Sequence, residues 1–380
     1  MMPPTPWTLR IEDLRTLEKV EWSPDGVCVV VGPNGSGKTT LLNALMLLSL
    51  VFTRDMDTAL RLVSPAQLRR VSAAANDPVV LDLTLGAVRW VLMLPAAEYG
   101  LQGFYGEELY HQDRLVLRSP LLSQQAQIDG APFTIDPDER RCLTRVLWDR
   151  DEPEWLRPMA GWLRSLRIYK DWLLHRLRQP WQRGDSFSYL SNTGDNLWTV
   201  LDTWDATRTY RGQLRWVIEK LRLAFPTQLE SIEFAPGVRV FRPNAPLPGQ
   251  GLPPDVLADG LLTALLQLTA VTGAKEGSTL AFDEMENQLH PFAIRVILGA
   301  MREEAERKGL TILLTTHSPE VLNEFRGDEE RVFVLGEPGR TQPVALADLV
   351  HEDELPIAYI GERYLRERFA PQSALARSQR

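Results

Sequence analysis

In the last third of the chain, short runs of apolar residues alternate with longer segments in which apolar and polar residues are mixed. The pattern predicts helices at 256–271, 293–307 and 319–325, separated by strands at 278–282, 310–314 and 331–335. Strands that alternate with helices at this spacing are typical of a parallel sheet with helices on its faces. We therefore expect an α/β fold.

The first third begins with a strand, a loop and a helix. The run Val-Cys-Val-Val-Val after Gly26 has no polar break, which is typical of a strand buried on both faces. A glycine-rich turn follows, and the apolar segment from Thr39 predicts a helix. Further along, 79–85 and 87–94 flank Gly86 and predict a β-hairpin. We also expect a helix start at Ser64-Pro65 and short strands at 113–117, 231–235 and 238–241.

The middle of the chain, 137–230, is mainly helical in pattern, is broken by prolines and holds eight of the eleven tryptophans. Between Arg140 and Arg183 there are eleven basic and five acidic residues. One interpretation is a helical unit with tryptophans in its core and solvated or ion-paired arginines. The other is a nucleic-acid surface in which arginines contact phosphates and aromatic rings stack on bases. A Pro/Gly-rich stretch at 243–254 ends this part.

Composition limits the class of protein. The 380 residues carry 42 basic and 50 acidic side chains, a net charge of −8, and 44% are hydrophobic. These values exclude a disordered chain and a uniformly basic nucleic-acid coat. Cys28 and Cys142 lie far apart, so neither a zinc site nor a disulfide framework is indicated. No signal peptide is visible and the longest apolar stretch, 41–52, is too short to cross a bilayer. We expect a cytoplasmic protein with no membrane partner.

A phosphate-binding loop is the strongest motif. Residues 32–39 match the pattern G-x-x-x-x-G-K-[ST], between the predicted buried strand and a helix. Glycines let backbone N–H groups converge on a phosphate at the helix N-terminus. The lysine can reach the β- and γ-phosphates, and the hydroxyl of Thr39 can bind Mg²⁺. The predicted ATP-binding residues are Gly32, Pro33, Asn34, Gly35, Ser36, Gly37, Lys38, Thr39 and Thr40.

Carboxylates and an imidazole follow the next two apolar strands. Asp283 is expected to hold Mg²⁺ with Thr39, and Glu284 to polarise the attacking water. His317 is expected at the γ-phosphate. With Lys38, Glu284 and His317 form the predicted catalytic set. His290 lies before a proline that starts a helix, and a structural or dimer-contact role there is as well supported as a catalytic one.

The three motifs GPNGSGKTT, DEMENQLHP and TTHSP, in this order, resemble the ABC-type ATPase heads of the SMC, RecF and OLD-like families. The resemblance covers 8–95 and 231–336 well, and 190–201 more weakly. It implies an α/β P-loop NTPase, ABC/SMC-head-like, with a parallel core sheet, an antiparallel β lobe and a helical insert. The expected units are 1–136, 137–230 and 231–380.

In these families two heads sandwich ATP, and a signature segment of one head caps the γ-phosphate bound by the other. The matching stretch here is 257–260, which places Asp259 and Gly260 among the residues implied to bind ATP in a partner copy. Ala258 stands where the family usually has serine, which removes one hydroxyl donor. A glutamine should couple the lobes, and Gln124, Gln125 and Gln127 are the candidates.

The resemblance implies an ATPase that acts as a nucleotide-gated dimeric head in DNA repair and recombination or in anti-phage defence. Its output would pass to DNA or to a nuclease or toxin-like effector. Only 45 residues follow Leu335, so we expect no nuclease domain in this chain. Two alternatives stay open. One is the ATP subunit of a transporter, against which the segment LADGL and the long insert argue, and the other is a nucleotide-binding scaffold without hydrolysis.

Overall fold

A computed structural model of the chain describes residues 6–62, 77–94, 105–121, 123, 125–136, 138–181, 186–234, 237–243, 251–336, 342–349, 360–361 and 364. The expected helix start at Ser64-Pro65 and the candidate Gln124 lie outside these residues. No helix within these ranges is long and apolar enough to cross a membrane.

The core of the molecule is a six-stranded sheet with the order β10-β13-β14-β3-β15-β16. Its first five strands are parallel, and β16 pairs antiparallel to β15. The expected parallel sheet is therefore confirmed, although β10 was not expected. The strands are β3 (Val27–Val31), β10 (Arg167–Tyr169), β13 (Thr279–Phe282), β14 (Thr311–Thr315), β15 (Val332–Val334) and β16 (Val344–Ala345).

A second sheet is antiparallel and has eight strands in the order β2-β1-β4-β5-β6-β7-β8-β9. The predicted hairpin around Gly86 is confirmed as β4 and β5, which pair from Val79↔Leu94 to Leu85↔Val88. The strands are β1 (Trp7–Leu14), β2 (Leu17–Trp22), β4 (Val79–Leu85), β5 (Val88–Leu94), β6 (Gly106–His111), β7 (Arg114–Ser119), β8 (Gln125–Ile128) and β9 (Ala131–Thr134).

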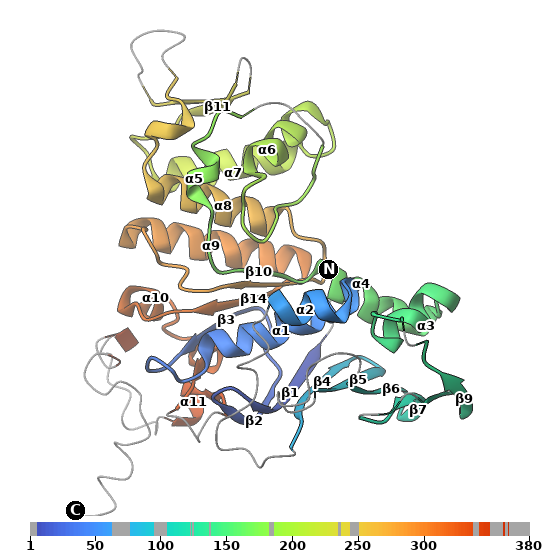
Figure 1. Cartoon of the computed structure of the whole chain (residues 1–380). Coiled ribbons are helices and arrows are strands. Elements are labelled where there is room, and N and C mark those ends of the chain that lie inside the picture. Colours follow the sequence, from blue (N-terminus) through green and yellow to red (C-terminus); the bar gives the residue numbers. More distant parts are fainter. Residues whose placement is uncertain are drawn as a thin grey trace, which may run out of the picture.

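Helices cover both faces of the core sheet (Figure 1). They are α1 (Lys38–Thr53), α2 (Met56–Leu62), α3 (Leu143–Asp151), α4 (Arg157–Ser165), α5 (Leu174–Leu177), α6 (Leu197–Ala206), α7 (Arg211–Ala224), α8 (Asp259–Thr272), α9 (Pro291–Lys308), α10 (Pro319–Asn323) and α11 (Leu346–Leu349). Short 3₁₀ helices lie at Glu154–Leu156, Pro254–Val256 and Glu329–Arg331, and β11 (Ser231–Glu233) pairs with β12 (Arg239–Phe241) as a separate hairpin.

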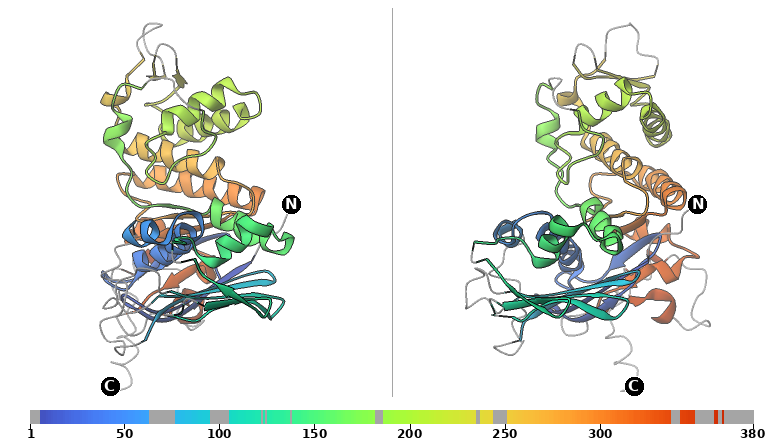
Figure 2. Two further views of the ribbon diagram at one scale, coloured as in Figure 1. Left: turned by 45° about the vertical axis from the view of Figure 1, so that its right-hand side comes forward. Right: turned by 90° about the vertical axis from the view of Figure 1, so that its right-hand side faces the viewer.

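The two faces of β3 belong to two different hydrophobic cores. Val27, Val29 and Val31 pack with α6–α9. Cys28 and Val30 face α1, α3, α4 and the antiparallel sheet. Figure 2 shows the antiparallel sheet on one side of the molecule and the stacked helices α6–α8 on the other. Because successive side chains of a strand point to opposite faces, β3 contributes to the cores of two lobes, one on each face of the core sheet.

The middle segment, 137–230, contributes to both lobes. Helices α3 and α4 pack in the core that contains α1, while α6 and α7 pack in the core that contains α8 and α9. Between them, β10 adds an edge to the parallel sheet beside β13. The division of the chain at 137 and 230 stays a prediction, since helices of this segment pack in the cores of both lobes.

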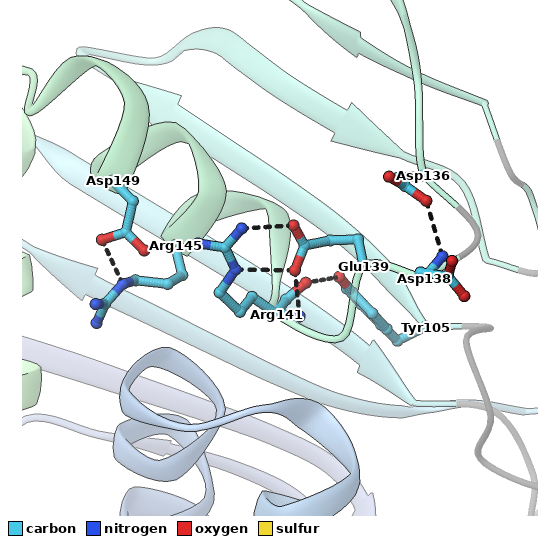
Figure 3. Close-up of polar contacts among 7 residues, drawn as sticks. All are labelled: Tyr105, Asp136, Asp138, Glu139, Arg141, Arg145 and Asp149. Carbon is cyan, nitrogen blue, oxygen red and sulfur yellow. Dashed lines mark hydrogen bonds and ion pairs between the residues drawn. The ribbon is translucent and has the colours of Figure 1, made fainter.

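Most aromatic and basic side chains of this segment have internal partners. Trp148, Trp162, Trp198 and Trp204 are buried. Arg141 forms ion pairs with Glu139 at 2.7 Å and Asp149 at 3.1 Å, and Arg145 pairs with Asp149 at 2.7 Å. Figure 3 shows these residues together. These contacts favour the interpretation of the segment as a packed, ion-paired unit over a continuous nucleic-acid surface.

Candidate functional site

The phosphate-binding loop lies between β3 and α1, as its sequence predicted. Gly37 is the N-cap of α1 with φ 109°, a left-handed conformation that side chains rarely adopt. A Cβ on Gly37 would also lie 2.4 Å from Cδ2 of Leu17. Glycine is therefore required here, because the β1–β2 turn packs directly against the loop. The α1 N-terminus is thereby left open to an anion.

Lys38 is buried, and no carboxylate among the described residues is in direct contact with it. Its Nζ donates to the carbonyl oxygens of Gly32, at 2.9 Å, and Pro33, at 3.3 Å. Burial lowers the pKa of Lys38, and the fields of Asp283 and Glu284 oppose that shift. A desolvated ammonium group held only by neutral carbonyls is suited to an anionic ligand, and a phosphate would supply the missing charge.

Thr39 and Asp283 meet across the site. The Thr39 hydroxyl lies 3.0 Å from Oδ2 of Asp283, and Thr315 donates to Oδ1 of the same carboxylate. A hydroxyl and one carboxylate are the protein ligands that Mg²⁺ takes in nucleotide sites, where phosphates and water complete its shell. The described residues contain no group of three or more His, Cys, Asp or Glu that could hold a metal by itself. The donor set therefore fits a magnesium ion that arrives with its nucleotide.

Glu284 follows Asp283 in a strained conformation. Its φ is 49°, in the left-handed region, and its backbone N–H donates to Oγ1 of Thr315 at 2.9 Å. Asn287 donates to Oε2 of Glu284 at 3.0 Å. Backbone strain of this kind persists where surrounding contacts enforce it, and it is common at functional sites. The effect here is to turn an exposed carboxylate toward the cavity in front of Lys38.

His317 completes this side of the site. Its backbone N–H donates to Oε1 of the half-buried Glu286 at 3.0 Å, and its Nδ1 lies 3.4 Å from the Tyr364 hydroxyl. Burial, and secondarily the charge of Lys38, lowers the pKa of the His317 ring and so favours its neutral form. Burial raises the pKa of Glu286. Glu286 thus fixes the His317 backbone from the loop that carries Asp283 and Glu284.

A cavity of about 200 Å³ joins these groups. Lys38, Thr39, Asp283, Glu284 and His317 all line it, so the structure brings together residues that lie up to 279 positions apart in the chain. The loop residues Asn34, Gly35, Gly37 and Thr40 also line it. Gly32, Pro33 and Ser36 lie in the same loop, where the carbonyls of the first two bind Lys38.

Two residues at the site were not anticipated. Thr16, in the β1–β2 turn, lines the cavity. Lys170 directly follows β10, whose Tyr169 pairs with Phe282, so Lys170 is level with Asp283. It donates to Oδ1 of Asn43 on α1. The apolar pair before Lys170 was the available signal, but three residues are too few to distinguish a strand from a loop.

The segment 257–260 does not line this cavity in its own chain. Ala258 and Asp259 are exposed at the start of α8, where Arg178 donates to the Asp259 carboxylate. Gly260 packs so closely that an added Cβ would lie 2.5 Å from the carbonyl oxygen of Gln288. This contact holds the start of α8 against the loop after Glu284.

The other candidates also lie elsewhere. Gln125 and Gln127 are on β8, near one edge of the antiparallel sheet, and do not line the cavity. The ring of His290 accepts a hydrogen bond from the Phe292 backbone at 3.3 Å and caps α9. Of its three proposed roles, this geometry supports the structural one.

Comparisons with known proteins agree with the motifs. A family model described as "AAA domain, putative AbiEii toxin, Type IV TA system" matches residues 228–323. A solved SMC head, bound to the C-winged helix domain of ScpA, aligns with TM-score 0.51 and 13% identity over 90% of this chain and 97% of that one. An SMC head domain from Thermotoga maritima aligns at 0.42 and 13%, over 90% and 99%.

An ATP-binding cassette of an ABC transporter, in its ADP conformation, aligns with TM-score 0.36 and 13% identity over 89% of each chain. No curated protein sequence matches this chain. The likeness to the first SMC head shows the fold, and the expected fold class is confirmed: the chain has the P-loop NTPase fold of an ABC/SMC-like ATPase head.

Proposed function

We propose that this chain binds ATP with Mg²⁺ and hydrolyses it. The observation that carries the proposal is the convergence of Lys38, Thr39, Asp283, Glu284 and His317 around one small cavity. Phosphoryl transfer to water requires a cation, a metal-binding pair and a carboxylate that faces the attacking water. Lys38 is the cation, Thr39 and Asp283 are the pair, and Glu284 is the carboxylate.

Each residue has a distinct task in this proposal. Lys38 exchanges its carbonyl partners for the β- and γ-phosphates, and Thr39 and Asp283 hold Mg²⁺, which neutralises charge on the phosphates. Glu284 orients the attacking water and accepts its proton. The ring of His317 donates one hydrogen bond to an oxygen of the γ-phosphate, and Glu286 holds the His317 backbone in place.

We propose further that two copies close on the nucleotide. The start of α8 is exposed in its own chain and lies outside the cavity, so only a second copy could bring it to the γ-phosphate. Two large apolar side chains near helix starts are also exposed, Val256 at 56%, three residues before α8, and Phe292 at 51%, in the first turn of α9. Exposed apolar side chains around a helix N-terminus suit an interface that forms when ATP is bound and opens after hydrolysis.

The output of this cycle is proposed to pass to another molecule. The matching family description names a toxin, and the matched SMC head is bound to a domain of ScpA. By analogy, an effector protein such as a nuclease or toxin would respond to dimer closure in anti-phage defence. DNA would be the partner if the role is in repair or recombination. A scaffold that binds ATP without hydrolysis remains the alternative, since Ala258 lacks the hydroxyl that the signature segment of this group usually supplies.

The decisive test compares wild type, Glu284→Gln and a matched control, Glu306→Gln, which changes an exposed glutamate of α9 outside the cavity. We expect Glu284→Gln to lose at least 100-fold in hydrolysis rate, the range seen when a catalytic proton acceptor is removed. ATP binding should be retained and a dimer should accumulate with Mg-ATP. Glu306→Gln should behave as wild type.

Unchanged hydrolysis in Glu284→Gln would remove this residue as the base. ATP binding by the wild type without any hydrolysis would favour the scaffold. Purifying tagged Glu284→Gln with Mg-ATP and identifying the proteins and nucleic acid bound to it would then separate an effector from DNA.

A further inference from the structure

A second cavity, of about 690 Å³, lies between the two lobes, beside β10 and β13. Arg167 and Leu280, which pair across these strands, both line it. Asp283 lies three residues beyond Leu280, a separation of about 10 Å along a strand. No residue of the ATP cavity lines this one, so the two are distinct sites.

Positive charge dominates this second cavity. Arg157, Arg164, Arg167 and Lys275 line it, and no carboxylate is among its described lining residues. The whole chain carries a net charge of −8, so a cavity whose described lining holds four cations and no carboxylate is a local exception. A pocket lined by one sign of charge concentrates the opposite ion. Such a cavity suits an anion with more than one negative charge.

Aromatic rings and guanidinium groups form its walls. Arg164 lies 5.4 Å from the centre of the Trp148 ring, and Arg167 lies 4.9 Å from that of Tyr189. Tyr189 is 50% exposed, so part of its ring remains open to a ligand. Flat guanidinium and aromatic groups stack well on nucleobases. Gln213 also lines the cavity, and its Oε1 accepts no hydrogen bond from any described residue.

The volume of the cavity and the small extent of its positive region favour a small ligand over a nucleic-acid strand. A volume of about 690 Å³ is within the usual range for small-molecule sites. The adjoining cavity, which shares Arg157 and Lys275, also has Glu154 and Glu276 in its lining and is thus balanced in charge. A continuous phosphate backbone would have to cross that neutral region, whereas one nucleotide would not.

We propose that this cavity is a second nucleotide site, which binds the base and phosphate of a free nucleotide independently of the phosphate-binding loop. The base stacks against Tyr189 and the guanidinium groups, and the phosphate contacts Arg157 and Lys275. An amino group on the base that reaches Gln213 would satisfy its carbonyl oxygen.

The test uses AMP as the probe, in EDTA, with the full chain carrying Lys38→Ala so that the phosphate-binding loop is disabled. Isothermal titration should show one saturable site, as in the wild type. Arg157→Glu and Lys275→Glu should each weaken AMP binding at least tenfold, Arg157→Gln and Lys275→Gln about threefold, and Tyr189→Ala about fivefold. The matched control Arg150→Glu, an exposed residue of α3 outside the cavity, should change it by less than twofold.

Thermal unfolding of each variant confirms that it is folded, and the glutamine variants serve if a charge reversal does not fold. Absence of saturable AMP binding, or binding that ignores both Arg157 and Lys275 variants, would overturn the proposal. Tight binding of a 20-nucleotide single strand without AMP binding would also overturn it and would identify the ligand as a nucleic acid. Because Lys38→Ala abolishes the proposed hydrolysis from the outset, failure here leaves the ATPase proposal untouched, and the reverse also holds.

Discussion

Besides Lys38, the side chains of Lys308 and Lys170 are also withdrawn from bulk water, and their charges are compensated in different ways. Lys308 is buried, lies 3.3 Å from the Glu304 carboxylate, and also donates to backbone carbonyls, so its charge is neutralised inside the fold. Lys170 is half-buried and donates to a neutral amide, Asn43, while burial lowers its pKa against the field of Asp283. Lys170 is level with Asp283, so we propose it as a second cation that acts on the phosphates in the proposed ATP site.

We expect Lys170→Gln to lower the rate of ATP hydrolysis about tenfold, with a smaller effect on ATP binding, since charge at a developing anion acts mainly in the transition state. Steady-state kinetics of kcat and KM measure this. Lys170→Arg should recover part of kcat because it keeps the charge. Equal rates for all three proteins would show that Lys170 serves only to hold α1.

The lowered pKa of His317 predicts how stability depends on pH. The folded chain binds a proton at this ring less readily than the unfolded chain, whose pKa is near the ordinary 6.5. Stability is therefore lost as pH falls below about 6.5, and nothing changes between pH 7 and 8. Without nucleotide, the melting temperature of wild type should fall more steeply from pH 7 to 5 than that of His317→Gln. Parallel curves would contradict this.

Local pattern was sufficient for some elements and insufficient for others. The apolar run of β3, the glycines after it and the apolar start of α1 predicted the phosphate-binding loop, because each depends on neighbours in sequence. By contrast, β10 has three residues and is a strand only because β13 lies beside it. The start of helix α3 also depends on a residue distant in sequence. Glu107, on strand β6 of the antiparallel sheet, accepts hydrogen bonds from the backbone N–H groups of Leu143 and Thr144. The local sequence pattern does not predict such contacts between residues that are distant in the chain.

Removing the Glu107 carboxylate should destabilise the lobe that contains α1, α3, α4 and the antiparallel sheet. Glu107 is fully buried and also accepts from Nε1 of Trp90 at 2.8 Å. Glu107→Ala leaves three buried N–H donors without an acceptor, which costs roughly 3 kcal/mol or more of unfolding free energy at about 1 kcal/mol or more per donor. Urea denaturation measures the loss. The neighbour Glu108→Ala, which removes a partly exposed ion pair with Arg118, should cost less than about 1 kcal/mol.

On the scale of the whole molecule, the candidate site is assembled at the carboxyl ends of parallel strands that share one edge of the core sheet. Spacing in sequence predicted which motifs meet there, because β3, β13 and β14 had to be neighbours for the motifs to work together. It could not predict the charge in the second cavity, since that depends on how α4, β10 and the end of α8 are placed in three dimensions. The start of α8 does not line the cavity of its own chain, and its proposed role lies in a second copy.

If that part acts in a second copy, two inactive variants should restore each other. Lys38→Ala lacks a working phosphate-binding loop but keeps the start of α8. Ala258→Trp keeps the loop, and because Ala258 is exposed, the new ring meets solvent in its own chain and obstructs only a partner's nucleotide. In a symmetric dimer, each mixed pair has one intact site out of two. With half the dimers mixed, about a quarter of wild-type hydrolysis should return, although each variant alone is inactive. Full activity of Ala258→Trp alone, or mixed dimers without recovered hydrolysis, would show that α8 does not act across the interface.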